Sequence, residues 1–237
     1  MHSTKGAPRA GILATRIEMS QSDESLGPTR FIDSDHPTIV AFAKAAVGDA
    51  TTNAEKVERL FRAVREHLRY DPYTVSFAPE DYLASRIVTG NAGYCVPKAV
   101  LLTAVLRAAG IPARIGFADV KNHLSSKKLH DVLGSDLFVF HGYVEVMLEG
   151  KPYKLTPAFN ASLCARSGVA PLEFDPRAPA DALLQSFDGE GKKYMEYTAD
   201  RGTFAELPLD EILATFTKEY PRLRTLARER DEAFHAR

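Results

Sequence analysis

One cysteine in the sequence has the surroundings of a nucleophile. Cys95 follows Gly93-Tyr94 and stands where a long apolar segment, residues 96–109, begins. This segment predicts a helix buried in the middle of a domain, because it is apolar nearly all round. The unpaired N–H groups at a helix start favour a thiolate over a thiol, and a thiolate is the attacking species in covalent acyl transfer. We therefore expect an acidic, nucleophilic Cys95; a small buried hydrophobic residue is the alternative.

A histidine later in the chain is the candidate base for this thiol. His141 lies within residues 136–149, the strongest strand pattern in the sequence. Alternation puts Phe138 and Phe140 on the core face of this strand and His141 on the other face. A histidine in a buried strand needs a polar partner, and the adjacent Gly142 leaves space for another backbone or a ligand. An ordinary structural histidine is the alternative interpretation.

The elements before Cys95 are predicted to be helical. Asp35-His36-Pro37 has the pattern of a helix start with Asp35 as the cap, and Thr52 or Asn53 can cap a second helix. A possible first strand, residues 12–19, is separated from these helices by a polar stretch.

The elements after the apolar helix are predicted to form a sheet. Residues 113–120 suit a strand, residues 121–134 a polar loop, and residues 136–149 and 152–156 a hairpin. A short strand over 194–198 and helices over 209–220 and 222–234 are expected in the C-terminal third. Helices followed by an antiparallel sheet packed on a central helix define an α+β fold.

Composition narrows the class of protein. The chain has 237 residues with a net charge of -1, so no basic field favours a nucleic-acid partner. No segment approaches the roughly 18 apolar residues of a membrane span, and the short apolar run over 10–14 is no signal-peptide core. We expect a cytoplasmic protein with no membrane partner, built as one domain over 1–237 with its core at about 37–160 and an extension at about 161–237. Cys95 and Cys164 are expected to be free thiols rather than a bridge, and no metal-ligand spacing is present.

Three motifs in order resemble one family. Gly93-Tyr94-Cys95, with its helix ending in LRAAGIPAR at 106–114, resembles the nucleophile segment of transglutaminase-like domains. The sequence HGYVEV at 141–146 resembles their histidine strand, and KLTP at 154–157 resembles the strand that follows. The resemblance covers residues 55–160 and is strongest to bacterial transglutaminase-like cysteine proteases. It implies a papain-like α+β core, a Cys–His–Asp triad and action on amide bonds, by hydrolysis or by transfer to an amine, without metal or organic cofactor.

The chain departs from this pattern at one position. Thr156 stands where the family has its aspartate. A threonine hydroxyl can accept the Nδ1 proton of the histidine and hold the ring, but it brings no charge. Thr156 is the first candidate for the third catalytic residue and Asn160 is the alternative. Asp131 and Asp136, in or next to the preceding loop, also stay open.

The groups that could stabilise an oxyanion are less defined by the sequence. The backbone N–H of Cys95 is one donor. Asn91, Tyr94 and Tyr70 are candidates for a second donor or for the wall of the cleft, and Tyr73 is a further one.

The expected function is that of a cysteine-dependent enzyme acting through a thioester. It would hydrolyse a peptide-like or small amide substrate, or transfer its acyl group, with Cys95 as nucleophile and His141 as base. Hydrolysis is favoured over protein crosslinking because no calcium site is visible, and no protein partner is identified. A catalytically weak or inactive binding module is the alternative. A redox sensor that uses Cys95 and Cys164 has little support, because no C-x-x-C motif occurs.

Overall fold

The computed structural model describes residues 24–123, 125–177 and 195–228. The strand expected over 12–19 lies outside the described residues, as does the last part of the helix expected over 222–234; residues 223–228 are helical. No helix among the described residues is long and apolar enough to cross a membrane.

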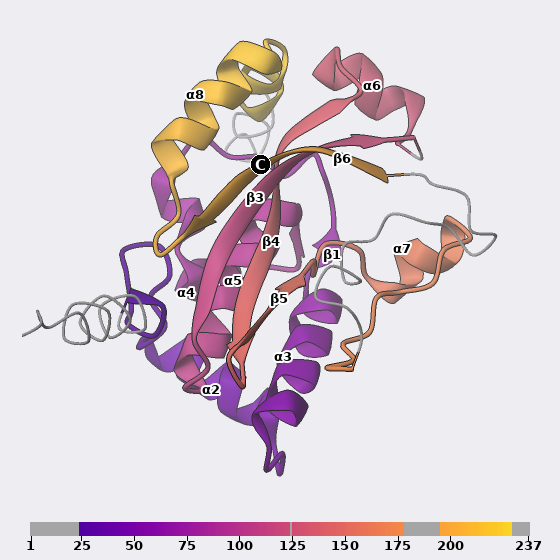
Figure 1. The fold of residues 1–237 in the computed structure, drawn as a ribbon. Coiled ribbons are helices and arrows are strands. Elements are labelled where there is room, and N and C mark those ends of the chain that lie inside the picture. The colour runs from indigo at the N-terminus through magenta and orange to yellow at the C-terminus, as the bar shows by residue number, and fades with distance from the viewer. Residues whose placement is uncertain (1–23, 124, 178–194, 229–237) are drawn as a thin grey trace, which may run out of the picture.

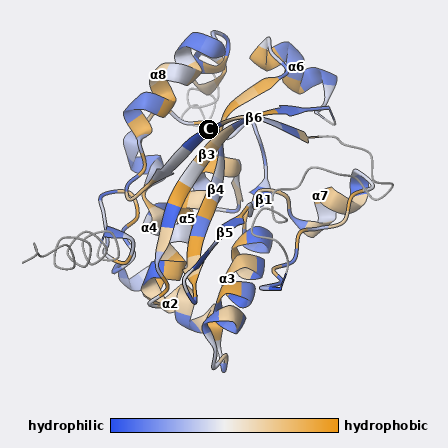
Figure 2. Cartoon of the chain, in the orientation of Figure 1, coloured by the Kyte–Doolittle hydropathy of each residue, from blue (hydrophilic) through white to orange (hydrophobic). Residues whose placement is uncertain are grey.

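The helices before Cys95 form as the sequence predicted. The first two are α2 (Pro37–Val47) and α3 (Asn53–His67), followed by a 3₁₀ turn, η1 (Pro79–Tyr82), and by α4 (Ala84–Ile87). Thr52 caps α3 in a capping box with Glu55, which confirms that prediction. Asp35 as the cap of α2 is wrong, because the imidazole of His36 accepts the N–H of Thr38 instead. Figure 2 shows hydrophobic and hydrophilic residues interleaved along α3, as an amphipathic helix requires.

Helix α5 (Cys95–Ala108) is the centre of the molecule. It packs against the sheet strands β3 and β4 and also against α2, α3 and α4 (Figure 1). The three polar side chains of α5 are buried, and each donates to backbone carbonyls. Lys98 donates to the carbonyls of Arg65 in α3 and of Leu68 just after it, and Thr103 bonds within the helix. Arg107 ties the end of the helix to the first residue of β3 and to two loops. These bonds let a helix with polar residues stay buried on all sides.

Four antiparallel strands form the main sheet in the order β5-β4-β3-β6. They are β3 (Ala113–Asn122), β4 (Leu137–Leu148), β5 (Lys151–Leu155) and β6 (Met195–Phe204). The hairpin of β4 and β5 confirms the sequence prediction. Strand β6 is longer than expected and pairs with β3, which places a C-terminal segment at one edge of the main sheet. A small parallel pair, β1 (Arg69–Tyr70) with β2 (Ala92–Gly93), leads directly into Cys95.

Strand β4 has a bulge next to His141. Ala118 of β3 pairs with His141 and Val120 pairs with Phe138, so one residue of β3 faces two of β4. Phe140 takes a positive φ of 55° and its N–H is held by the carboxylate of Asp119. The regular alternation expected along the whole strand is therefore wrong at Phe140.

Residues expected to form a loop contain a helix. Helix α6 (Lys127–Leu133) starts at Ser126, whose hydroxyl accepts the N–H of Leu129, and ends at Gly134 with φ of 69°. The prediction of a loop over 121–134 is wrong, because these two caps and the burial of Leu129 and Leu133 stabilise a short helix. The described part of the C-terminal third also holds α7 (Ala161–Arg166) and α8 (Leu209–Glu219).

Candidate active site

Cys95 lies at the contact between α5 and β4. Its side chain is buried, and the pairing of Tyr70 with Gly93 fixes the backbone just before it. Gly142 packs directly on this turn of the helix: a Cβ there would lie 2.9 Å from the carbonyl oxygen of Cys95 and 3.1 Å from Cβ of Ala99. Gly142 thus provides the space for a second backbone that the sequence predicted.

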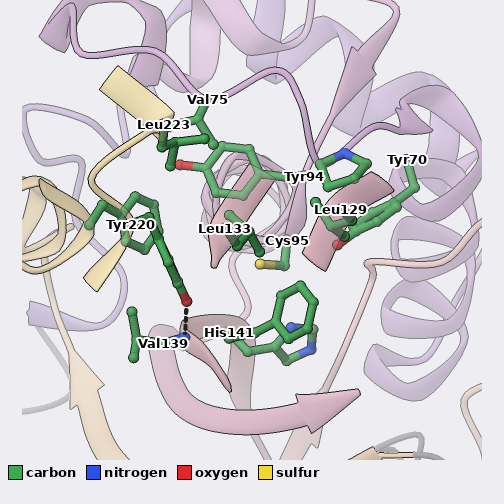
Figure 3. Close-up of a pocket in the computed structure, with 13 residues that line it drawn as sticks. Tyr70, Val75, Tyr94, Cys95, Leu129, Leu133, Val139, His141, Tyr220 and Leu223 are labelled. Carbon is green, nitrogen blue, oxygen red and sulfur yellow. Dashed lines mark hydrogen bonds between the residues drawn. The ribbon is translucent and has the colours of Figure 1, made fainter. Parts of the chain in front are cut away.

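Cys95 and His141 line the same small cavity (Figure 3). The cavity has a volume of about 50 Å³, and the imidazole lies on its β4 side. Its other walls are apolar or aromatic, and they come from the loop after β1, from α6, from α8 and from the residues that follow α8. The fold therefore brings together the nucleophile and base that lie 46 residues apart in the chain (141 minus 95).

Burial controls the protonation of both groups. It raises the pKa of the Cys95 thiol to about 11, although the N–H groups of Gly142, Val96 and Cys95 itself act in the opposite direction. Burial also lowers the pKa of His141 to about 4. At neutral pH the pair consists of a neutral thiol and a neutral imidazole. The expected acidic thiol is wrong for this closed arrangement, because desolvation outweighs the helix start.

Three buried polar groups are found on the His141 side of the catalytic pair, one of them on His141 itself. Nε2 of His141, the hydroxyl of Thr156 and the phenol of Tyr197 have no hydrogen-bond partner among the described residues. The rings of His141 and Tyr197 meet edge to face with centroids 6.3 Å apart. Burial raises the pKa of Tyr197, and the hydroxyl of Thr156 partly offsets this shift, so the two hydroxyl groups are close neighbours. We call His141, Thr156 and Tyr197 the polar cluster.

Tyr197 is a member of this cluster that sequence analysis missed. It lies on β6, where it pairs with Val120 of β3, and it lines a pocket together with Ala118 of β3 and Tyr143 of β4. Its strand was expected, but no sequence signal indicates that β6 pairs with β3.

The other candidates for a third residue have their side chains engaged elsewhere. The amide of Asn160 accepts the N–H of Tyr70 at 3.2 Å and donates to the hydroxyl of Ser162 at 2.8 Å. Asp131 and Asp136 are exposed and face lysine side chains.

The candidates for an oxyanion donor are spread around the cavity. Tyr94 and Tyr70 line it, but the hydroxyl of Tyr94 is bonded to that of Tyr82 at 2.8 Å. The ring of Tyr70 packs edge to face on Phe159. Asn91 is exposed and is absent from the cavity wall.

The C-terminal elements cover the catalytic pair. Tyr220 is the main contact: its hydroxyl accepts the N–H of Val139 at 2.7 Å and donates to the carbonyl of Leu137 at 2.8 Å (Figure 3). Phe216 and Leu223 close the same wall. Helix α8 and residues 220–228 thus cover Cys95, and we call this segment the cover.

The two cysteines do not form a disulfide bond with each other. Cys95 and Cys164 are both free and buried, which confirms the expectation of two thiols without a bridge. Within the described ranges, no three His, Cys, Asp or Glu side chains form a group that could hold a metal ion.

Comparison with known proteins agrees with this geometry. The family model described as transglutaminase-like superfamily matches residues 40–155, a segment that includes Cys95 and His141 and ends one residue before Thr156. This segment thus matches the superfamily that the three sequence motifs resemble, and the fold is the α+β core that the sequence predicted. A search of curated protein sequences found no match.

Solved structures with low sequence identity are also similar. A putative cysteine protease from Cytophaga hutchinsonii is 22% identical with a TM-score of 0.43, over 57% of this chain and 41% of that one. A TGase is 17% identical with a TM-score of 0.39, over 75% and 43%. The arylamine N-acetyltransferase from Mycobacterium abscessus is 15% identical with a TM-score of 0.43, over 78% and 70%. The chain thus spans less than half the length of the first two proteins.

Proposed function

We propose that this protein is a cysteine-dependent acyl transferase or amide hydrolase that forms a thioester on Cys95. Its substrates are peptide-like or small amides. The main support is that Cys95, at the start of a buried helix, lines one cavity together with His141. The match of residues 40–155 to the transglutaminase-like superfamily supports the same chemistry.

The proposed reaction begins with transfer of the thiol proton from Cys95 to His141. The sulfur attacks the carbonyl carbon of the substrate, and the carbonyl π electrons move onto oxygen to form an oxyanion. We propose that the backbone N–H of Cys95, at the start of α5, donates to this oxygen. Collapse of the oxyanion breaks the carbon–nitrogen bond, and His141 gives its proton to the leaving amine. Water or another amine then attacks the thioester, losing a proton to His141, and the Cys95 thiol is restored.

Thr156 and Tyr197 are proposed to orient the imidazole. The support is the polar cluster, in which two unpartnered hydroxyl groups lie beside a histidine with an unpartnered ring nitrogen. A hydroxyl oxygen can accept a hydrogen bond from the ring N–H and so hold the imidazole in one orientation. It cannot stabilise the imidazolium as a carboxylate does, so the base is expected to be weaker than in a Cys–His–Asp triad.

A second candidate function is a binding module with little or no catalysis. Three observations favour it: Thr156 replaces the aspartate, burial keeps both catalytic groups neutral, and the cavity at Cys95 holds only about 50 Å³.

Trapping of the thioester decides between the two functions. The protein is incubated with a series of 4-nitrophenyl esters and peptide amides, and adducts are mapped by mass spectrometry. An acyl adduct on Cys95 is expected, with loss in Cys95→Ala and strong slowing in His141→Gln. The adduct on Cys95 should persist in Cys164→Ala, which removes the other buried thiol. Absence of any adduct or turnover in folded wild-type protein supports the binding module instead.

A further inference from the structure

A larger cavity adjoins the one at Cys95. It has a volume of about 350 Å³ and lies among the loop after β1, the start of α6, and α7. Tyr70, Pro72, Leu129 and Phe138 line both cavities, so the two spaces share a wall made of these side chains. The larger space therefore adjoins the place where a reacting carbonyl would lie at Cys95.

The walls of the larger cavity are aromatic and uncharged. Four rings line it, from Tyr70, Tyr73, Phe138 and Phe159, and none of its lining residues within the described part of the chain is acidic or basic. Tyr70 and Phe159 already meet edge to face with centroids 4.9 Å apart. Such walls favour an aromatic guest, which can continue the edge-to-face packing.

Two of the hydroxyl groups that line the cavity have partners within the protein. That of Ser125 donates to the carbonyl of Asn122 and bonds the ring of His130. That of Ser126 accepts the N–H of Leu129 as the cap of α6. Because no charged side chain is among the described lining residues, a charged group that entered the cavity would lose its hydration without gaining a counter-ion.

The two volumes fit two different parts of one substrate. An apolar cavity of about 150 Å³ holds a benzene molecule, so the larger cavity has room for an aromatic ring with its linker. The cavity at Cys95 has space for only a few atoms, as a carbonyl group needs.

We propose that the larger cavity is a specificity subsite, and that the substrates are acyl donors or amides with an uncharged aromatic group next to the reacting carbonyl. This inference rests on the proposed function, since it places the reacting carbonyl at Cys95.

Binding to an inactive variant tests the subsite without relying on catalysis. Phenylacetamide and N-benzylacetamide, which carry the ring on the acyl or the amine side, are titrated into Cys95→Ala and followed by NMR. At least one is expected to bind about 10- to 100-fold more tightly than acetamide, because the ring is buried. The 4-carboxy analogue of the tighter compound is expected to bind no better than acetamide.

Variants that fill the larger cavity test whether the aryl amides bind there. Ser167→Phe and Leu163→Phe each place a ring into the larger cavity from α7 or its end. Both are expected to weaken aryl amide binding by tenfold or more. Ala165→Phe is the matched control, since Ala165 is exposed on the same helix and is not part of the cavity wall. Unchanged binding in both filled variants, or equal binding of acetamide and the aryl amides, overturns the subsite.

Turnover by the wild-type protein separates failure of the subsite from failure of the function. Phenylacetyl esters are expected to acylate Cys95 faster than acetyl esters, and Ser167→Phe should remove the difference. Equal rates with both esters leave the proposed function intact but refute the subsite. Tight aryl amide binding with no acylation by any substrate refutes the proposed function and leaves the subsite in place.

Discussion

Replacement of Thr156 by aspartate tests how the polar cluster works. Burial lowers the pKa of His141 from 6.5 to about 4, which corresponds to about 3 kcal/mol against the imidazolium. An adjacent carboxylate raises the pKa of such a group by about 1–3 units. In Thr156→Asp the pKa of His141 is therefore expected between roughly 5 and 7, because the new charge offsets part or all of the desolvation.

The pKa of His141 is measured by NMR titration of the imidazole nitrogens. The chain contains seven histidines, so His141→Gln identifies the signal by its loss. A stronger base also stabilises the ion pair formed during attack, and acylation of Cys95 at pH 7 is expected to rise by roughly 10- to 100-fold. Thr156→Asn is the control, because it has the shape of aspartate without its charge.

Two results would refute this reasoning. An unchanged pKa of His141 in Thr156→Asp would mean that residue 156 does not face the imidazole. Equal acylation rates in Thr156→Asp and Thr156→Asn would mean that charge at this position has no part in the reaction.

Other predictions concern the buried pair and its cover. In the unfolded chain His141 becomes protonated below about pH 6.5, whereas in the folded protein its pKa is about 4. The free energy of unfolding should therefore fall by up to about 3 kcal/mol as the pH drops from 6.5 to 4. Urea unfolding should show a smaller fall in His141→Gln, and an identical pH dependence would contradict the buried neutral imidazole. Tyr220→Phe leaves two backbone groups of β4 unpaired at a cost of about 1–3 kcal/mol. It should speed the alkylation of Cys95 by iodoacetamide, and an unchanged rate would show that this hydroxyl does not hold the cover. Gly142→Ala forces a Cβ within 2.9 Å of the Cys95 carbonyl and should cost about 1–3 kcal/mol in urea unfolding; native stability would argue against the close packing of α5 on β4.

Local sequence features were sufficient for much of the framework. The apolar helix that begins at Cys95, the cap of α3 at Thr52 and the hairpin of β4 and β5 depend on residues a few positions apart. Periodicity and caps report such short-range interactions, so these elements were predicted correctly. The three motifs also predicted the family, because their order along the chain carries the order of the core elements.

Errors in the local predictions had local causes. The cap of α2 moved by one residue to His36, whose ring nitrogen can accept a backbone N–H as a carboxylate does. Helix α6 was missed because its seven residues give too short a pattern in a polar segment. The bulge at Phe140 depends on the carboxylate of Asp119 on the neighbouring strand, which periodicity along β4 does not report.

By itself, the sequence determined which groups are available for chemistry and which segments become helices and strands, since these follow from residue type and near-neighbour spacing. Only the tertiary structure decided that Tyr197 lies beside His141 and that Tyr220 covers Cys95, because both contacts join segments more than 50 residues apart. It also decided the protonation of the pair. The desolvation that keeps both groups neutral comes from side chains drawn from the whole fold, and it exceeds the favourable effect of the helix start that the sequence revealed.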